Sequence, residues 1–240
     1  MLCAALLFVA RPAGAQPGGP TMPGPQFSGA MEKLFGEHKA FSASLDLQTD
    51  GGSPGKVITM EGRIAILNGM SRVEMDLTQM KGVDMPPQAL AQMKQMGMDK
   101  MVTVSAPDAK VMRMMYPSMK AYLEMPLPDS AATPASDYKM ETTELGSETV
   151  AGHPCVKNKV VVTGSDGVAH ESTVWCAKDM DKFPVKIDLT ESGNHMTMTF
   201  NDVKLEKPDA AQFTAPTGYK KYDSMMSLIM SRAGGVQGTP

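Results

Sequence analysis

KVITMEGRIAIL-NG-MSRVEMDL, residues 56–77, is the stretch that decides the fold class of this chain. Two apolar/polar alternating runs flank Asn68-Gly69, the residue pair that a two-residue type I′ turn prefers. Such a turn pairs Ile64 with Val73 and Arg63 with Glu74. An apolar pair beside a pair of opposite charges is what a correct cross-strand register gives. The stretch therefore predicts an antiparallel β-hairpin.

Further strand-like segments follow along the chain, most of them joined by short turns. They are residues 41–47, 100–105, 110–116, 120–125, 183–190 and 195–205, with two more runs between Cys155 and Cys176. Helical spacing of apolar residues predicts helices over 27–39, 86–98 and 223–232. With about nine or ten strands and about two or three helices, the pattern predicts an antiparallel α+β protein. The alternation predicts one solvent-facing side of the sheet and one covered side.

The N-terminal residues are typical of an export signal. The apolar run LCAALLFVA (2–10) is followed by Ala13-Gly14-Ala15. An A-x-A site after a short apolar run predicts a signal peptide over residues 1–15, and hence a periplasmic protein. The Pro/Gly-rich segment 16–26 is then expected to be a flexible linker, 27–222 the domain, and 223–240 a short helix with a disordered tail.

Export bears on the cysteines, because two cysteines left in an oxidising compartment are expected to pair. Cys155 and Cys176 remain after removal of the signal peptide. If a four-residue loop, 164–167, joins the two strands between them, the cysteines lie directly opposite each other. The sequence therefore predicts a disulfide between Cys155 and Cys176.

Composition argues against several classes of function. With 23 basic against 26 acidic residues, the chain has no basic excess with which to bind nucleic acid. No apolar run is long enough for a transmembrane helix. Gly51-Gly52-Ser53-Pro54-Gly55 matches G-x-S-x-G, but Pro54 has no N–H for an oxyanion hole and a strand follows. The four histidines lack metal-ligand spacing. We therefore expect no enzyme, no cofactor and no metal site of histidines.

Methionine is the compositional anomaly, with 24 of 240 residues. On the predicted helix, Leu90, Met93 and Met96 form one apolar stripe, which we expect to face a cavity and contact a hydrophobic ligand. Because thioethers also suit Cu(I), the density of methionines from Met93 to Met101 leaves copper binding open. A third interpretation is that methionine simply replaces leucine in an ordinary core. A further alternative for the function is an envelope structural or protein-interaction module without a small ligand.

The second half of the chain carries a family resemblance. Four segments form an ordered series, namely ETVAGHPC (148–155), TVWCAKD (173–179), FPVK (183–186) and QFTAPTGY (212–219). Together they resemble a bacterial envelope family known as domain-of-unknown-function family 4412, which is similar to the superfamily of the lipoprotein carriers LolA and LolB.

The resemblance implies a strongly curved antiparallel sheet, an unclosed half barrel, with two or three helices over its concave face. In those carriers the cavity shelters acyl chains, so the resemblance implies a hydrophobic ligand or a lipoprotein as partner. No ligand-contact residue of the carriers can be matched here. The expectation is thus a periplasmic, non-catalytic binding protein for a lipid, an acyl chain or an apolar peptide, with an oligomeric state that the sequence leaves open.

Overall fold

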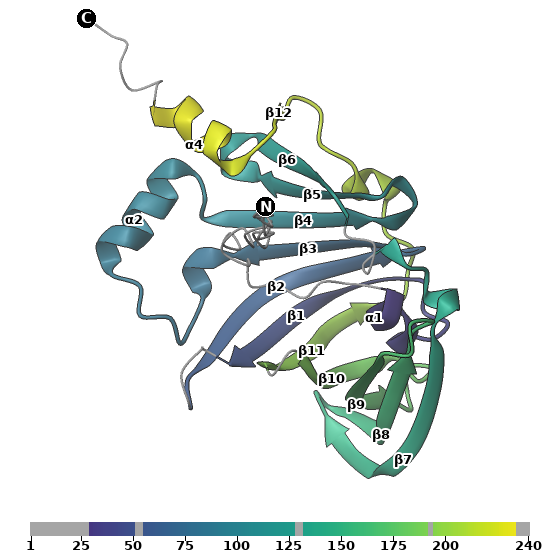
Figure 1. Ribbon diagram of the computed structural model, residues 1–240. Helices are drawn as coiled ribbons and strands as arrows, with labels where there is room; N and C mark the ends of the chain where they lie inside the picture. Colours follow the sequence, from purple (N-terminus) through teal and green to yellow (C-terminus); the bar gives the residue numbers. More distant parts are fainter. Residues whose placement is uncertain (1–28, 51–54, 128–131, 192–193, 234–240) are drawn as a thin grey trace, which may run out of the picture.

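The computed structural model describes residues 29–50, 55–127, 132–191 and 194–233. The expected signal peptide and linker, residues 51–54 of the G-x-S-x-G motif, and the end of the tail lie outside them. Three helices, α1, α2 and α4, accompany a sheet of twelve strands in the described chain (Figure 1). The helices are α1 Gly29–Leu34, α2 Pro87–Met96 and α4 Met225–Ala233; the strands are β1 Ala40–Asp50, β2 Val57–Leu67, β3 Met70–Asp76, β4 Lys100–Ala106, β5 Val111–Tyr116, β6 Ala121–Pro126, β7 Lys139–Val150, β8 His153–Thr163, β9 Ala169–Ala177, β10 Pro184–Glu191, β11 Asn194–Lys204 and β12 Lys220–Tyr222.

The sheet order is β12-β6-β5-β4-β3-β2-β1-β11-β10-β9-β8-β7. Most neighbours are consecutive antiparallel hairpins, and the predicted pairs Ile64–Val73 and Arg63–Glu74 are present in β2 and β3. Two pairings join distant parts of the chain. Strand β1 pairs antiparallel with β11, and the short β12 pairs parallel with β6.

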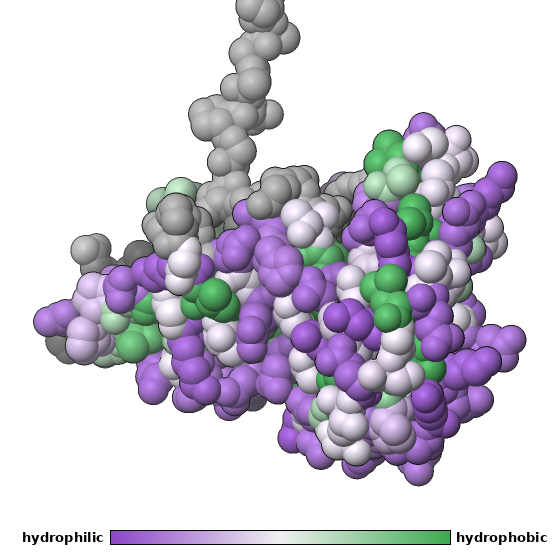
Figure 2. Space-filling view, turned by 90° about the horizontal axis from the view of Figure 1, so that it is seen from below, coloured by the Kyte–Doolittle hydropathy of each residue, from purple (hydrophilic) through white to green (hydrophobic). Residues whose placement is uncertain are grey.

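The two faces of the sheet differ as the alternation predicts. The inner face carries the buried apolar side chains, such as Leu45, Ile64 and Val174. The outer face is mostly polar and includes Arg63 and Lys186. A view from below the orientation of Figure 1 shows a largely hydrophilic surface with small, separate hydrophobic patches (Figure 2).

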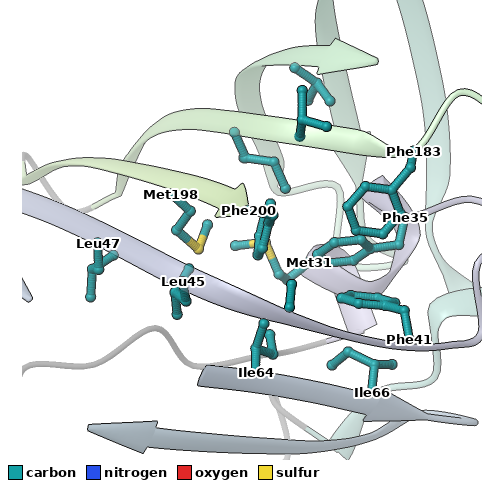
Figure 3. Close-up of a cluster of buried hydrophobic side chains, with 14 of the residues drawn as sticks. Met31, Phe35, Phe41, Leu45, Leu47, Ile64, Ile66, Phe183, Met198 and Phe200 are labelled. Atoms are coloured by element: carbon teal, nitrogen blue, oxygen red, sulfur yellow. The ribbon is translucent and has the colours of Figure 1, made fainter. Parts of the chain in front are cut away.

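Helix α1 packs on the inner face and anchors the main core. Phe35, at the end of this helix, lies with its ring centroid 4.8 Å from that of Phe41 in β1 and 5.5 Å from that of Phe200 in β11 (Figure 3). Phe183 completes the aromatic group at 5.9 Å from Phe35. These rings are essentially inaccessible to solvent. The helix therefore ties the first strand to the last antiparallel hairpin of the chain.

The shape of the sheet corrects one expectation. The α+β class is confirmed, and the sheet is antiparallel except for the β12–β6 pair. The described strands form a twisted sheet that is not strongly curled, so they make no half barrel (Figure 1). Right-handed twist between neighbouring strands is enough to rotate β7 and β8 away from β4 without closing the sheet. The helices also do not form one cover, because α1 and α4 pack on different parts of the inner face and α2 projects beside the strand ends.

Candidate functional site

Methionines gather at one end of the inner face, over β4, β5 and β6. Met101, Met114 and Met125 come from these strands, and strand alternation sends all three to the inner face. Met98, Met119 and Met225 pack against the same group. We call these six residues the methionine cluster. Its members lie between residue 98 and residue 225, so the cluster is built by the sheet and the C-terminal helix together.

Helix α4 covers the methionine cluster. Leu228 is 1% exposed and packs into the cluster, whereas Met226 and Met230 on the same helix are 65% and 64% exposed. Ile229 is also exposed. An apolar helix face that remains in water beside an apolar cluster is unusual for a purely structural helix. The exposed side chains of Met226 and Met230 lie on the side of α4 that faces away from Leu228 and the methionine cluster, where they are accessible to a ligand.

The predicted stripe lies on helix α2, which begins at Pro87 and ends at Gly97 in the left-handed conformation, with φ 74°. Leu90, Met93 and Met96 are half-buried, while Lys94 on the same helix is exposed. The three residues thus share one side of the helix, as the spacing predicts. None of the three residues lines the hollows beside Ser42, Glu32 and Gln79 in the described structure. Their contact with a ligand stays a prediction.

One hydrogen bond in the methionine cluster bears on its chemistry. The Tyr116 hydroxyl, which is fully buried, donates to Sδ of Met114 at 3.0 Å. Burial raises the pKa of Tyr116 to about 12, so the phenol keeps its proton at neutral pH. This sulfur is therefore already a hydrogen-bond acceptor.

The disulfide prediction is wrong in this structure, where Cys155 and Cys176 are free thiols. Strands β8 and β9 pair Cys155 with Ala177 and Cys176 with Val156. The loop is one residue longer than expected, because the last pair is Thr163–Ala169. A slip of one residue sends the two side chains to opposite faces of the sheet. Burial raises the pKa of both thiols, which lowers their reactivity.

Three of the histidines have a partner in the described structure. His153 Nδ1 lies 2.9 Å from a carboxylate oxygen of Asp179, and His195 Nε2 lies 2.5 Å from one of Asp188. His38 contacts the carbonyl oxygen of residue 181 at 2.9 Å. Among the described residues, no group of three or more His, Cys, Asp or Glu side chains could hold a metal ion. No described helix is long and apolar enough to cross a membrane.

Sequence reasoning missed the role of α4. Its apolar residues Met225, Met226, Leu228 and Ile229 predict a helix, but neither its cover of the methionine cluster nor the pairing of β12 with β6 has a local signal. Both depend on the chain returning to β6 after about a hundred residues of other strands.

Comparison with known proteins found weak structural likenesses. LprF from Mycobacterium bovis aligns at 11% identity and a TM-score of 0.41, covering 81% of this chain and 94% of that one. The Mycobacterium tuberculosis lipoprotein LppX aligns at 12% identity and a TM-score of 0.38, covering 74% of this chain and 92% of that one. A LolA superfamily protein from Nitrosomonas europaea aligns at 13% identity and a TM-score of 0.36, covering 79% of this chain and 96% of that one. These likenesses are too weak to transfer a function.

The comparison of sequences gives a firmer result. No curated protein matches the chain. Residues 60–183, more than half of the chain, match the model of a domain of unknown function, DUF4412. This range begins in β2 and ends just before β10. The chain therefore belongs to the DUF4412 family.

Proposed function

We propose that this protein is a non-catalytic, periplasmic binding protein that holds a hydrophobic ligand at the methionine cluster. The observation that carries the proposal is the joining of six methionines in one apolar group beneath helix α4, whose opposite side exposes Met226 and Met230. Methionine side chains are flexible and polarisable, so they adapt to ligands of irregular shape. A lipid, an acyl chain or an apolar peptide fits such a surface. Export to the periplasm rests on the apolar run 2–10 and the A-x-A site.

Helix α2 supplies the second wall of the proposed site. Its half-buried stripe, Leu90, Met93 and Met96, precedes Met98 of the methionine cluster directly. Since Gly97 ends the helix, the chain turns from the stripe into the cluster within two residues. We propose that the ligand contacts this stripe on one side and the methionine cluster on the other.

Cu(I) binding is the second candidate, and the concentration of thioether sulfurs favours it. Against it, the Met114 sulfur accepts the Tyr116 hydrogen bond. Native mass spectrometry of protein purified from the periplasm separates the candidates. A lipid-sized adduct supports hydrophobic binding, a copper adduct supports the metal site, and protein without any adduct supports an interaction module.

A pair of double variants tests the α2 stripe. M93L/M96L keeps the apolar volume but removes sulfur, and such swaps usually cost less than about 1.5 kcal/mol of stability. We expect it to bind a fluorescent fatty acid as the parent does. M93Q/M96Q places polar groups in the stripe, and we expect affinity to fall about tenfold, since burying an apolar side chain contributes about 1.5–3 kcal/mol.

The control for this pair is M140L, because Met140 is an exposed methionine on β7, far along the sheet from β4. Equal fatty-acid affinity in M93Q/M96Q and the parent would show that α2 does not contact the ligand. If the parent binds Cu(I) and M93L/M96L does not, the site is a copper site and not a site for a hydrophobic ligand.

A further inference from the structure

A hollow of about 410 Å³ opens on the outer face of the sheet, opposite the methionine cluster. Strands β1, β2 and β3 form its floor, and Gln212 of the short 3-10 helix Ala210–Phe213 forms one wall. Phe213 holds this wall in place, because it is buried against Val104 and Met115 on the outer face. The polar and charged side chains at the hollow are Ser42, Ser44, Arg63, Arg72, Glu74, Asp202, Lys204 and Gln212.

The ion pairs in this hollow leave one guanidinium without a partner. Glu74 lies opposite Arg63 in the register of β2 and β3, yet its carboxylate binds Arg72, at 2.8 Å from Nε and 2.7 Å from Nη2. Arg72 also donates from Nη1 to the carbonyl oxygen of Gln212 at 2.8 Å, which fixes it against the wall. Within the described chain, the Arg63 guanidinium has neither an ion pair nor a hydrogen bond. Its side chain is exposed at the hollow.

A β-bulge brings a second cation to the same place. The register between β1 and β11 shifts between Ser42 and Ser44, and Asp202 takes φ 51°, a left-handed conformation that is uncommon for a residue with a side chain. Asp202 accepts a hydrogen bond from the Ser44 hydroxyl at 3.0 Å. Lys204, which pairs with Ser42, has no acidic partner among the described residues. The hollow thus has three cations against two carboxylates, one of which binds Arg72 through Oε1.

We propose that this hollow binds a phosphate group through Arg63 and Lys204. A guanidinium presents paired N–H donors that match phosphate oxygens, and a lysine ammonium adds a point charge. Ser42 places a hydroxyl beside them. The phosphate can belong to a free phosphate or small phosphate ester, or to a lipid headgroup. Because the hollow and the methionine cluster lie on opposite faces of the sheet, this inference does not depend on the proposed function.

Two binding measurements on the full chain test the proposal and separate the two sources of phosphate. The first is isothermal titration with inorganic phosphate at low ionic strength. The second is co-sedimentation with vesicles of phosphatidylcholine, with and without phosphatidylglycerol. Each uses the parent, R63Q, K204Q and the control K139Q, which removes an exposed lysine from the far edge strand β7. Exposed substitutions of this kind change stability little.

We expect R63Q to weaken binding about tenfold, the loss of one charge-assisted hydrogen bond, and K204Q to weaken it as well. K139Q should bind as the parent does. Binding of inorganic phosphate but not of phosphatidylglycerol vesicles identifies free phosphate or an ester as the ligand. Binding only to phosphatidylglycerol vesicles identifies a lipid headgroup. The proposal is overturned if the parent binds neither probe, or if R63Q and K139Q lose affinity equally.

Discussion

At the scale of single residues, several ion pairs tie one strand to another. Glu124 in β6 is the clearest case. One of its carboxylate oxygens lies 2.7 Å from the Lys221 ammonium in β12, and the other lies 2.8 Å from Nε of Arg113 in β5. The hydrogen bond from Lys221, assisted by Arg113, lowers the pKa of Glu124 below its ordinary value in spite of partial burial. One carboxylate therefore bridges three strands at the edge of the sheet.

This arrangement predicts a pH-dependent contribution to stability. A carboxylate whose pKa is lowered by folding stabilises the protein above its unfolded pKa, and this gain disappears as the pH falls through the folded pKa. We expect E124Q to lower the free energy of unfolding at pH 7 by about 1 kcal/mol. The difference from the parent should vanish below the folded pKa of Glu124, which lies below the ordinary glutamate value of 4.5. Urea unfolding at pH 7 and in acid checks this.

E144Q is the matched control, since Glu144 is an exposed glutamate of the edge strand β7 with no ion pair in the described structure. It should change the unfolding free energy little at either pH. A difference between E124Q and the parent that is the same in acid as at pH 7 would show that Glu124 contributes by packing and not by charge.

At the scale of elements, helix α4 shows how a short segment can decide what a sheet face presents to solvent. Alone, nine residues form a marginal helix, so its stability depends on packing. Leu228 supplies that packing by inserting between Met101, Met114 and Leu123. Met225 also packs against the cluster, whereas Met226, Ile229 and Met230 are exposed. The helix is therefore anchored chiefly through one buried leucine.

Two alanine variants of α4 distinguish the buried side of the helix from the exposed one. L228A removes a fully buried side chain from the methionine cluster, and we expect it to lower the free energy of unfolding by about 2–4 kcal/mol. M226A removes a methionine that is 65% exposed, and the change should stay within about 0.5 kcal/mol. Chemical denaturation of both variants is the measurement. Similar costs for the two would mean that α4 is not seated on the sheet through Leu228.

At the scale of the whole molecule, the sheet is made continuous by a contact between distant parts of the chain. β1 and β11 pair through residues such as Leu45 and Phe200, more than a hundred residues apart. We call the β1–β11 pairing the seam. A pairing of this kind costs loop-closure entropy before it contributes contacts, so the fold depends on the burial of apolar side chains at the seam. Helix α1 provides it, because Phe35 contacts rings from both sides.

The seam gives a prediction for global stability. F35A removes the ring that lies among Phe41, Phe183 and Phe200, and we expect a loss of about 3–5 kcal/mol in the free energy of unfolding. Unfolding should remain a single transition whether followed by the Trp175 fluorescence or by far-ultraviolet circular dichroism. L205A, at a leucine that is 43% exposed, is the control and should be nearly neutral. A small cost for F35A would contradict the role of α1 as an anchor.

Local patterns in the sequence were sufficient for the hairpins and the short helices. Asn68-Gly69 determined the register of β2 and β3, because the turn fixes which residues face each other. Gly97 marked the end of α2 in the same way, since only a residue that tolerates positive φ suits that position. The periodicity around Met93 also indicated which side of that helix is half-buried. The methionine content pointed to a site, and the match to DUF4412 confirmed the family resemblance.

Only the tertiary structure decided the features that depend on distant pairing or on a single residue of register. The extra loop residue between β8 and β9 moved Cys155 and Cys176 to opposite faces, a difference that turn composition does not reveal. The methionine cluster required β4, β5, β6 and α4 to meet, and the hollow with Arg63 required the bulge between β1 and β11. The overall shape, a twisted sheet without strong curl, follows from the sum of small rotations between strands. Local sequence specifies the β2–β3 hairpin, but the sum of those rotations and the pairings between distant strands are set by packing across the whole molecule.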